Sequence, residues 1–395
     1  MRRRRDLTPW ILTAALLAVW IVLAQLTEAG FFAHAYYDSY TRQALAWRQG
    51  SLHLSQNIPH LELAIYEGDY YVSFPPVPSL VLLPLTFLFG AETPDNLLVK
   101  LYALGACLLM YRALRRAGYG KCSGGLIAFL FCMGSSLLPM TLDGSVWYHA
   151  QTLAFFLMVA SICLLAMDRM TPCLFLYALS VGCRPFNALY AAPLFGVWFF
   201  INHRDGVPVR AMARALLPGI GLGLLVAFDL GLYNFIRFGN PLEFGHNYLP
   251  EFSFQGGVQF SLDHVKDNAE TFLLGLPLEK TEEGWAFRRF GYSMLIACPA
   301  LTLMLAGFAV DVVKKQLRWE KVLVLACCVL HAFLLLLHRT FGGFQLGARY
   351  AVDLMPYAFF YLLLTPEKRK AGAAEILVLA AVFLMTCVGV VQVHI

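Results

Sequence analysis

Charged residues are scarce in this chain. Asp, Glu, Lys and Arg make up 14% of its 395 residues, whereas about a quarter is usual for a soluble domain. Apolar residues reach 59%, and the mean hydropathy is +0.63. The basic residues form short clusters between apolar runs rather than one patch, which argues against a nucleic-acid-binding protein. The composition instead indicates a membrane protein.

Metal-binding cysteine patterns and internal repeats are also absent. The ten cysteines include no CxxC pair and no His/Cys spacing typical of zinc. Nearly all of them lie within apolar runs, so we interpret them as small core residues. The sequence shows no repeat and no low-complexity linker. We therefore expect one membrane domain over residues 1–395, without the inverted repeats of many transporters.

Eleven apolar runs predict transmembrane helices, because about 20 apolar residues cross a bilayer. They lie near 9–26, 97–114, 122–140, 150–167, 172–184, 185–201, 216–233, 291–310, 321–338, 350–364 and 373–393. Arg2 to Arg5 before the first run resemble the start of a signal peptide. The length of that run, its lack of a small-residue cleavage site and the many later runs favour a retained helix. The fold class we expect is an all-α polytopic membrane protein.

The segment 76–90 decides the topology. It is apolar but only 15 residues long with three prolines, which suits a re-entrant or interfacial helix better than a span. If it does not span, 19 of the 30 Lys and Arg fall on the cytoplasmic side, against 13 if it does. The positive-inside rule then predicts a cytoplasmic N-terminus and an external C-terminus. Both long loops, 27–96 and 234–290, would face outside, where we expect the chemistry.

Asp38 follows directly on the first predicted span. Tyr40, Ala44 and Trp47 recur at helical spacing, so residues 37–49 are predicted to form a short amphipathic helix at the interface. Two interpretations of Asp38 stay open. Its carboxylate either caps this helix by accepting backbone N–H bonds, or takes a proton from an acceptor hydroxyl at membrane depth.

A turn at 67–69, Glu-Gly-Asp, comes next in the first loop and is flanked by tyrosines at 66, 70 and 71. Tyrosines of this kind are common in the aromatic belt at a membrane interface. Phe74-Pro75-Pro76 then opens the short apolar segment. A more specific hypothesis is that this segment folds back towards the first external loop and forms a cavity beneath that loop.

The order of these features resembles the C-type (GT-C) glycosyltransferase superfamily, which includes protein O-mannosyltransferases and lipid A aminoarabinose transferases. The resemblance extends to RPFNALYAAP (184–193), YNFIRFGNPLEFGHNYLPEF (233–252) and FGGFQLGARYAVDLMPY (341–357). It covers nearly the whole chain and depends on order and spacing rather than on one specific motif. It implies two juxtamembrane helices in the first external loop, with 76–90 as the second.

The resemblance also implies a function. A sugar would pass with inversion from a polyprenyl-phosphate donor to a hydroxyl of a glycan, lipid or protein acceptor, outside the bacterial plasma membrane. Asp38 matches the usual catalytic acid of the family. Ser39 stands where many members carry a second acid, and Phe74 where many mannosyltransferases carry histidine. Without paired carboxylates we predict no metal site and no other cofactor.

A leaving lipid phosphate requires fixed positive charge near the outer interface. The candidates are Arg349, preferred because arginine binds phosphate bidentately, then Lys100 and Arg184, with Arg237 and Arg339 as further basic residues. Snorkelling to lipid headgroups is the alternative role for such residues. The candidates for binding the sugar or acceptor are Tyr37, Tyr66, Tyr71, Asp143, His149 and Glu243. A plain turn explains Asp143-Gly144 as well as a binding role does.

Three rival functions stay in view. A transporter or flippase of lipid-linked sugars would carry ionisable groups at mid-bilayer, and a non-catalytic scaffold of envelope assembly would keep only the fold. A membrane acyltransferase would rely on buried histidines such as His331 or His338, which no partner motif accompanies here. Replacing Asp38 with asparagine separates an enzyme from the flippase and the scaffold, because only the enzyme would lose transfer.

Overall fold

The computed structural model describes residues 6–251, 259–365 and 373–394. Two basic clusters on which the predicted topology depends, at 2–5 and 368–370, lie outside the described residues. So does residue 252, the last residue of the segment 233–252. The chain divides into two compact units. The terminal unit comprises residues 1–31, 100–142 and 262–395, and the central unit comprises 32–99 and 143–261.

The terminal unit is mostly helical, with one small hairpin. Its elements are α1 (Thr8–Leu26), most of α4 (Asp95–Arg116), α5 (Lys121–Met133), α6 (Leu137–Met140), α12 (Asp263–Ala269), η4 (Glu270–Leu274), β3 (Leu278–Thr281), β4 (Gly284–Phe287), α13 (Met294–Ala297), α14 (Pro299–Val313), α15 (Trp319–Leu336), η5 (Arg349–Leu354), α16 (Met355–Leu363) and α17 (Ala373–His394). Here α1 and α17 pack on α5, and α16 packs against α14 and α15.

The central unit combines long helices with the short elements of the first loop. Its elements are α2 (Ser39–Arg48), β1 (Leu63–Tyr66), β2 (Asp69–Val72), α3 (Val77–Phe89), η1 (Gly90–Glu92), α7 (Val146–Leu165), α8 (Met170–Val181), η2 (Pro185–Tyr190), α9 (Ala191–Arg204), α10 (Val209–Phe238) and η3 (His246–Tyr248). In this unit α8 packs between α7 and α10.

Each of the eleven predicted spans contains a helix, which confirms an all-α membrane protein. Within the described residues, six helices are long and apolar enough to cross a membrane: α1, α4, α7, α10, α15 and α17. Four others, at 77–92, 121–133, 170–181 and 299–313, are apolar but shorter. The count of eleven spans therefore stays a prediction, as does the orientation of the termini.

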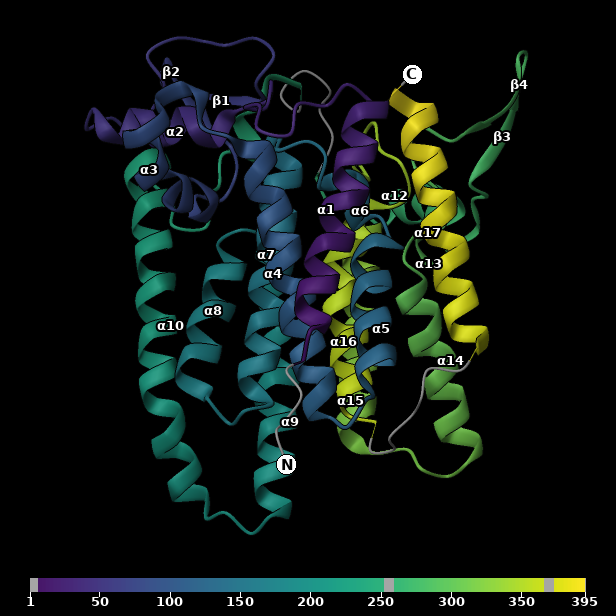
Figure 1. Ribbon diagram of the computed structural model, residues 1–395. Coiled ribbons are helices and arrows are strands. Elements are labelled where there is room, and N and C mark those ends of the chain that lie inside the picture. The colour runs from purple at the N-terminus through teal and green to yellow at the C-terminus, as the bar shows by residue number, and fades with distance from the viewer. Residues whose placement is uncertain (1–5, 252–258, 366–372, 395) are drawn as a thin grey trace. The chain divides into compact units, whose positions relative to one another are not determined.

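Both short helices predicted in the first loop are present. Ser39–Arg48 form α2 within the predicted range 37–49, and Val77–Phe89 form α3, a helix of 13 residues within the predicted range 76–90. The two pack against each other, and α2 lies over one end of α10 in Figure 1. The Gln43 amide donates to the Tyr233 hydroxyl of α10 at 2.9 Å, and Ser79 of α3 donates to Gln43 at 2.7 Å. One glutamine thus ties both short helices to α10.

The predicted turn at 67–69 is a two-residue hairpin loop. Tyr66 pairs with Asp69 across β1 and β2, and the two residues between them, Glu67 and Gly68, have φ of 52° and 91°. Positive φ at both positions is what the favoured hairpin turn requires, and glycine adopts it without steric cost. The sequence indicated the turn but not the strands on either side of it.

Candidate functional site

Asp38 directly precedes α2 but does not cap it. Its carboxylate accepts no hydrogen bond from a described backbone N–H of the first helical turn. Instead, Oδ2 accepts a bond of 2.9 Å from Nε of Arg42, one turn further along. The Asp38 side chain is 2% exposed and that of Arg42 is 41% exposed. The capping interpretation is therefore wrong for this side chain.

The surroundings of Asp38 make its carboxylate more basic than an ordinary one. Burial raises the pKa of Asp38, and the charges of Arg42 and, to a smaller extent, His34 oppose that rise. Desolvation disfavours the ionised form of an acid, whereas a nearby cation favours it. A carboxylate with a raised pKa accepts a proton from a hydroxyl more readily. The geometry thus suits a general base.

Asp95 is a second buried carboxylate, which sequence analysis missed. Its Oδ1 accepts a 3.1 Å bond from the Thr41 hydroxyl of α2, and its Oδ2 accepts a 3.4 Å bond from the backbone N–H of Ala35. These bonds fix the segment on both sides of Asp38 to the start of α4. In the sequence, Asp95 follows Thr93-Pro94 and resembles the common acid of a first helical turn. No local sequence pattern distinguishes an ordinary acid of a first helical turn from one that holds the segment around Asp38.

The Asp143 side chain is engaged locally, by Ser145. Asp143 Oδ1 accepts bonds from the backbone N–H and the hydroxyl of Ser145, at 2.9 and 2.8 Å. The Gly144 N–H donates to Oδ1 of Asn96 at 2.6 Å. A Cβ at position 144 would lie 2.5 Å from the Asp95 carbonyl carbon. Glycine therefore allows this turn to pack closely on the start of α4.

Two predicted sugar-binding residues, Tyr37 and His149, make contacts close to Asp38 in the chain. The Tyr37 ring contacts the Trp147 ring with centroids 4.8 Å apart, and the Tyr37 carbonyl accepts a 3.0 Å bond from Val146. Buried His149 lies 6.1 Å from the Tyr40 ring. The start of α7 is therefore packed against the segment that carries Asp38.

The other three sugar candidates are Tyr66, Glu243 and Tyr71. Among the described residues, none of the contacts that these side chains make is with Asp38. Tyr66 packs against Phe238 and Tyr248 in a small apolar cluster. Glu243 accepts bonds from the Gly245 N–H and the Asn247 amide, at 2.7 and 2.6 Å, and so closes a turn. Tyr71 lies beyond the far end of α2, beside a cavity.

The three phosphate candidates are divided between the units. Arg184 belongs to the central unit with Asp38. It is half-buried before η2, within electrostatic range of the Tyr40 hydroxyl and the His246 ring. Burial lowers the pKa of His246, and the charge of Arg184 adds to that effect. Of these three candidates Arg184 shares a unit with Asp38, as does Arg237, one of the further basic residues.

Lys100 and Arg349 belong to the terminal unit, and both are buried. The Lys100 ammonium lies 4.9 Å from the centroid of the Phe31 ring. The Arg349 Nε donates to the Gly342 carbonyl at 3.1 Å, and its guanidinium lies 4.7 Å from the Tyr350 ring centroid. Their burial argues against snorkelling to headgroups for these two residues.

Metal ligands do not gather in the part of the chain that the structure describes: no three His, Cys, Asp or Glu side chains there are placed to hold an ion. Asp38 and Asp143 are each within electrostatic range of Asp95. These three acids are nevertheless engaged separately, by Arg42, Ser145 and Thr41.

Comparison with known proteins identifies the fold. No protein-family model and no curated protein matches the sequence. Among solved structures, ArnT from Cupriavidus metallidurans bound to undecaprenyl phosphate matches with a TM-score of 0.51 and 14% identity, over 89% of this chain and 58% of that one. The apo form of the same protein matches with a TM-score of 0.51 over 90% and 59% of the two chains.

The oligosaccharyltransferase of Archaeoglobus fulgidus in its apo form matches more weakly, with a TM-score of 0.48 and 12% identity over 96% of this chain and 55% of that one. The chain thus spans less than two thirds of the length of these proteins. At such low identity the likeness establishes architecture and not activity. The match to ArnT shows that this chain has the fold of the C-type (GT-C) membrane glycosyltransferases.

Proposed function

We propose that this protein transfers a sugar from a polyprenyl-phosphate donor to an acceptor hydroxyl on the extracytoplasmic face of a bacterial plasma membrane, with inversion. The observation that carries the proposal is the buried Asp38 carboxylate at the start of α2, bound through one oxygen to Arg42. The likeness to ArnT, which has been solved with undecaprenyl phosphate, supports the class of donor.

In the proposed reaction Asp38 takes the proton of the acceptor hydroxyl. The hydroxyl oxygen attacks the anomeric carbon as the bond from that carbon to the phosphate oxygen breaks. The sugar inverts, and polyprenyl phosphate leaves with the electron pair of the broken bond. Asp95, through Thr41 and Ala35, holds the segment that carries Asp38 and is a positioning residue.

The departing phosphate needs a cation that is already in place. Arg184 is our first candidate because it is half-buried in the unit that contains Asp38. Arg349 and Lys100 stay proposed for the same role. Tyr37 and His149 are proposed for the sugar or acceptor because they lie beside the neighbours of Asp38. Asp143, Tyr66 and Glu243 have structural partners that account for them.

The test is an assay, with purified full-length protein, of cleavage of the bond between the sugar and the lipid phosphate. A panel of undecaprenyl-phosphate-linked pentoses and hexoses is supplied together with extracted cell-envelope acceptors, and mass spectrometry measures the undecaprenyl phosphate released. We expect release by the wild type and a loss of at least about a hundredfold in Asp38→Asn. The matched control is Asp205→Asn, an exposed acid between α9 and α10, which should retain full activity.

Thermal unfolding of both variants shows whether the fold is intact. A folded Asp38→Asn protein that releases lipid phosphate at the wild-type rate contradicts the role of Asp38. A protein that moves lipid-linked sugars across vesicles but releases no lipid phosphate with any donor is a flippase, and the proposal then fails.

A further inference from the structure

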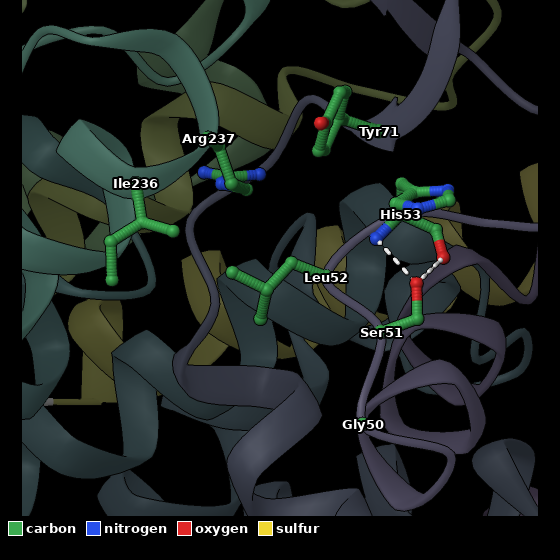
Figure 2. Close-up of a pocket in the computed structure, with 7 residues that line it drawn as sticks. All are labelled: Gly50, Ser51, Leu52, His53, Tyr71, Ile236 and Arg237. Carbon is green, nitrogen blue, oxygen red and sulfur yellow. Dashed lines mark hydrogen bonds between the residues drawn. The ribbon is translucent and has the colours of Figure 1, made fainter.

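A cavity of about 330 Å³ lies in the central unit beyond the C-terminal end of α2 (Figure 2). Its lining residues are Gly50, Ser51, Leu52, His53, Tyr71, Ile236 and Arg237. Asp38 stands at the opposite end of the ten-residue α2, about 15 Å away at 1.5 Å per residue. The volume is at the lower end of the range for small-molecule sites. The cavity is therefore separate from the proposed catalytic residue.

Arg237, near the C-terminal end of α10, brings to this cavity a positive charge that has no ion-pair partner among the described residues. Its side chain is almost wholly buried, with 3% exposed. Nη1 donates to the Val72 carbonyl and Nη2 to the Asn234 side chain, each at 2.9 Å. A guanidinium has five N–H donors, so three have no acceptor among the described residues. No described carboxylate forms an ion pair with Arg237.

Aromatic rings provide most of the remaining compensation. The guanidinium lies 4.0 Å from the Tyr233 ring centroid and 4.6 Å from that of Phe238. Glu243 is within electrostatic range, but its oxygens are bonded to Gly245 and Asn247. A buried charge without a counter-charge costs several kcal/mol. A bound anion would offset that cost, and arginine is well suited to phosphate.

The other polar side chains beside the cavity, Tyr71 and His53, both interact with Asp69. In Figure 2 the Arg237 guanidinium lies between Ile236 and Tyr71, with His53 on the far side of Tyr71. Tyr71 and Arg237 interact electrostatically. His53 lies 3.6 Å from Asp69 at the half-exposed rim. The Tyr71 hydroxyl interacts with the Asp69 carboxylate, so the N–H groups of Arg237 without an acceptor among the described residues are the donors left for a phosphate oxygen.

The remaining wall of the cavity is apolar and adjoins the lipid-facing side of α10. Ile236 is 61% exposed, and Phe228, Leu232 and Phe235 below it are also exposed. Only 6% of the most apolar 18-residue window of α10 is buried. We infer that this cavity binds a phosphate group at the outer membrane interface, with Arg237 as its principal ligand and Ile236 at the lipid-side opening.

A phosphate group can come from a membrane lipid or from solution, and the test distinguishes these sources. Full-length protein is purified in a nonionic detergent, and its unfolding midpoint is measured during titration. One arm compares potassium phosphate with potassium chloride at equal ionic strength. The other arm compares dioctanoyl phosphatidic acid with dioctanoylglycerol, which has the same chains but no phosphate. A ligand that binds only the folded state raises the midpoint.

We expect phosphatidic acid to raise the midpoint of the wild type and dioctanoylglycerol to leave it unchanged. Arg237→Gln retains amide donors without the charge, and binding should weaken by at least about tenfold. Ile236→Trp should block the cavity, and Ile236 is exposed enough for the substitution to leave the fold intact. The matched control is Arg48→Gln, an exposed arginine at the end of α2 that donates to the Thr86 carbonyl.

A response to phosphatidic acid alone identifies a lipid headgroup as the ligand, and an equal response to potassium phosphate identifies a soluble phosphate. The inference is overturned if neither phosphate compound shifts the midpoint. It is also overturned if the shift persists in both Arg237→Gln and Ile236→Trp. If Arg237→Gln does not fold, Ile236→Trp decides the result. None of these outcomes depends on sugar transfer, so the proposed function is tested separately.

Discussion

Removing the charge of Arg42 should change how activity depends on pH. Burial raises the pKa of Asp38, and Arg42 pulls it down. A base works only when ionised, so activity is lost as pH falls through the pKa of Asp38 in the folded protein. Arg42→Gln removes the cation, raises that pKa further and therefore moves the acid limb of the profile to higher pH.

The magnitude follows from the geometry. Two unit charges about 4 Å apart interact by about 1 kcal/mol in water and about 4 kcal/mol at an effective dielectric constant of 20. The Arg42 side chain is 41% exposed, so solvent screening favours the lower figure. About 1 kcal/mol corresponds to roughly a fivefold loss of rate at a pH on the acid limb. The rate on the plateau, where Asp38 is ionised in both proteins, should not change.

The assay is release of undecaprenyl phosphate from the donor that the wild type uses, measured across pH for wild type, Arg42→Gln and Arg42→Lys. The lysine variant keeps a cation and should stay closer to the wild-type profile. A loss that is equal at every pH would refute the reasoning, because it would place Arg42 in substrate binding or folding. A shift of the limb to lower pH would refute it as well.

Three further predictions concern other residues. Gly144→Ala should destabilise the protein by roughly 1–3 kcal/mol in unfolding experiments, since its Cβ would meet the backbone of Asp95. Asp311→Ala should cost about 3–5 kcal/mol, because it leaves buried Lys321 without its partner; adding Lys321→Met should restore most of the loss. Arg184→Gln should lower kcat by roughly a hundredfold or more with an unchanged unfolding midpoint, if it stabilises the leaving phosphate.

The sequence predicted the helices of this protein well because the signals are local. A run of about 20 apolar residues must form a helix in a bilayer to satisfy its backbone, and every predicted span contains one. The short helices α2 and α3 followed from helical spacing and from a run too short to span. The strands of the first-loop hairpin were missed because each is only four residues long.

The sequence also singled out Asp38, by its position after the first span, but not what its carboxylate binds. Its carboxylate pairs with Arg42 rather than with the helix N-terminus. The role of Asp95 depends on Thr41, 54 residues earlier in the chain. The Asp38–Arg42 pair has the i,i+4 spacing of a local helix pair, whereas the Asp95 contact with Thr41 cannot be deduced from local pattern.

What the sequence determined by itself is the set of apolar helices, the turn of the first hairpin and the placement of Asp38 at the start of a short helix. Only the tertiary structure shows the cavity lined by Arg237, Tyr71 and His53. Only the tertiary structure shows that the sugar candidates pack in different places. Hydropathy and turn preferences act over a few residues. A buried charge acquires its neighbours only when segments more than 160 residues apart, such as Val72 and Arg237, pack together.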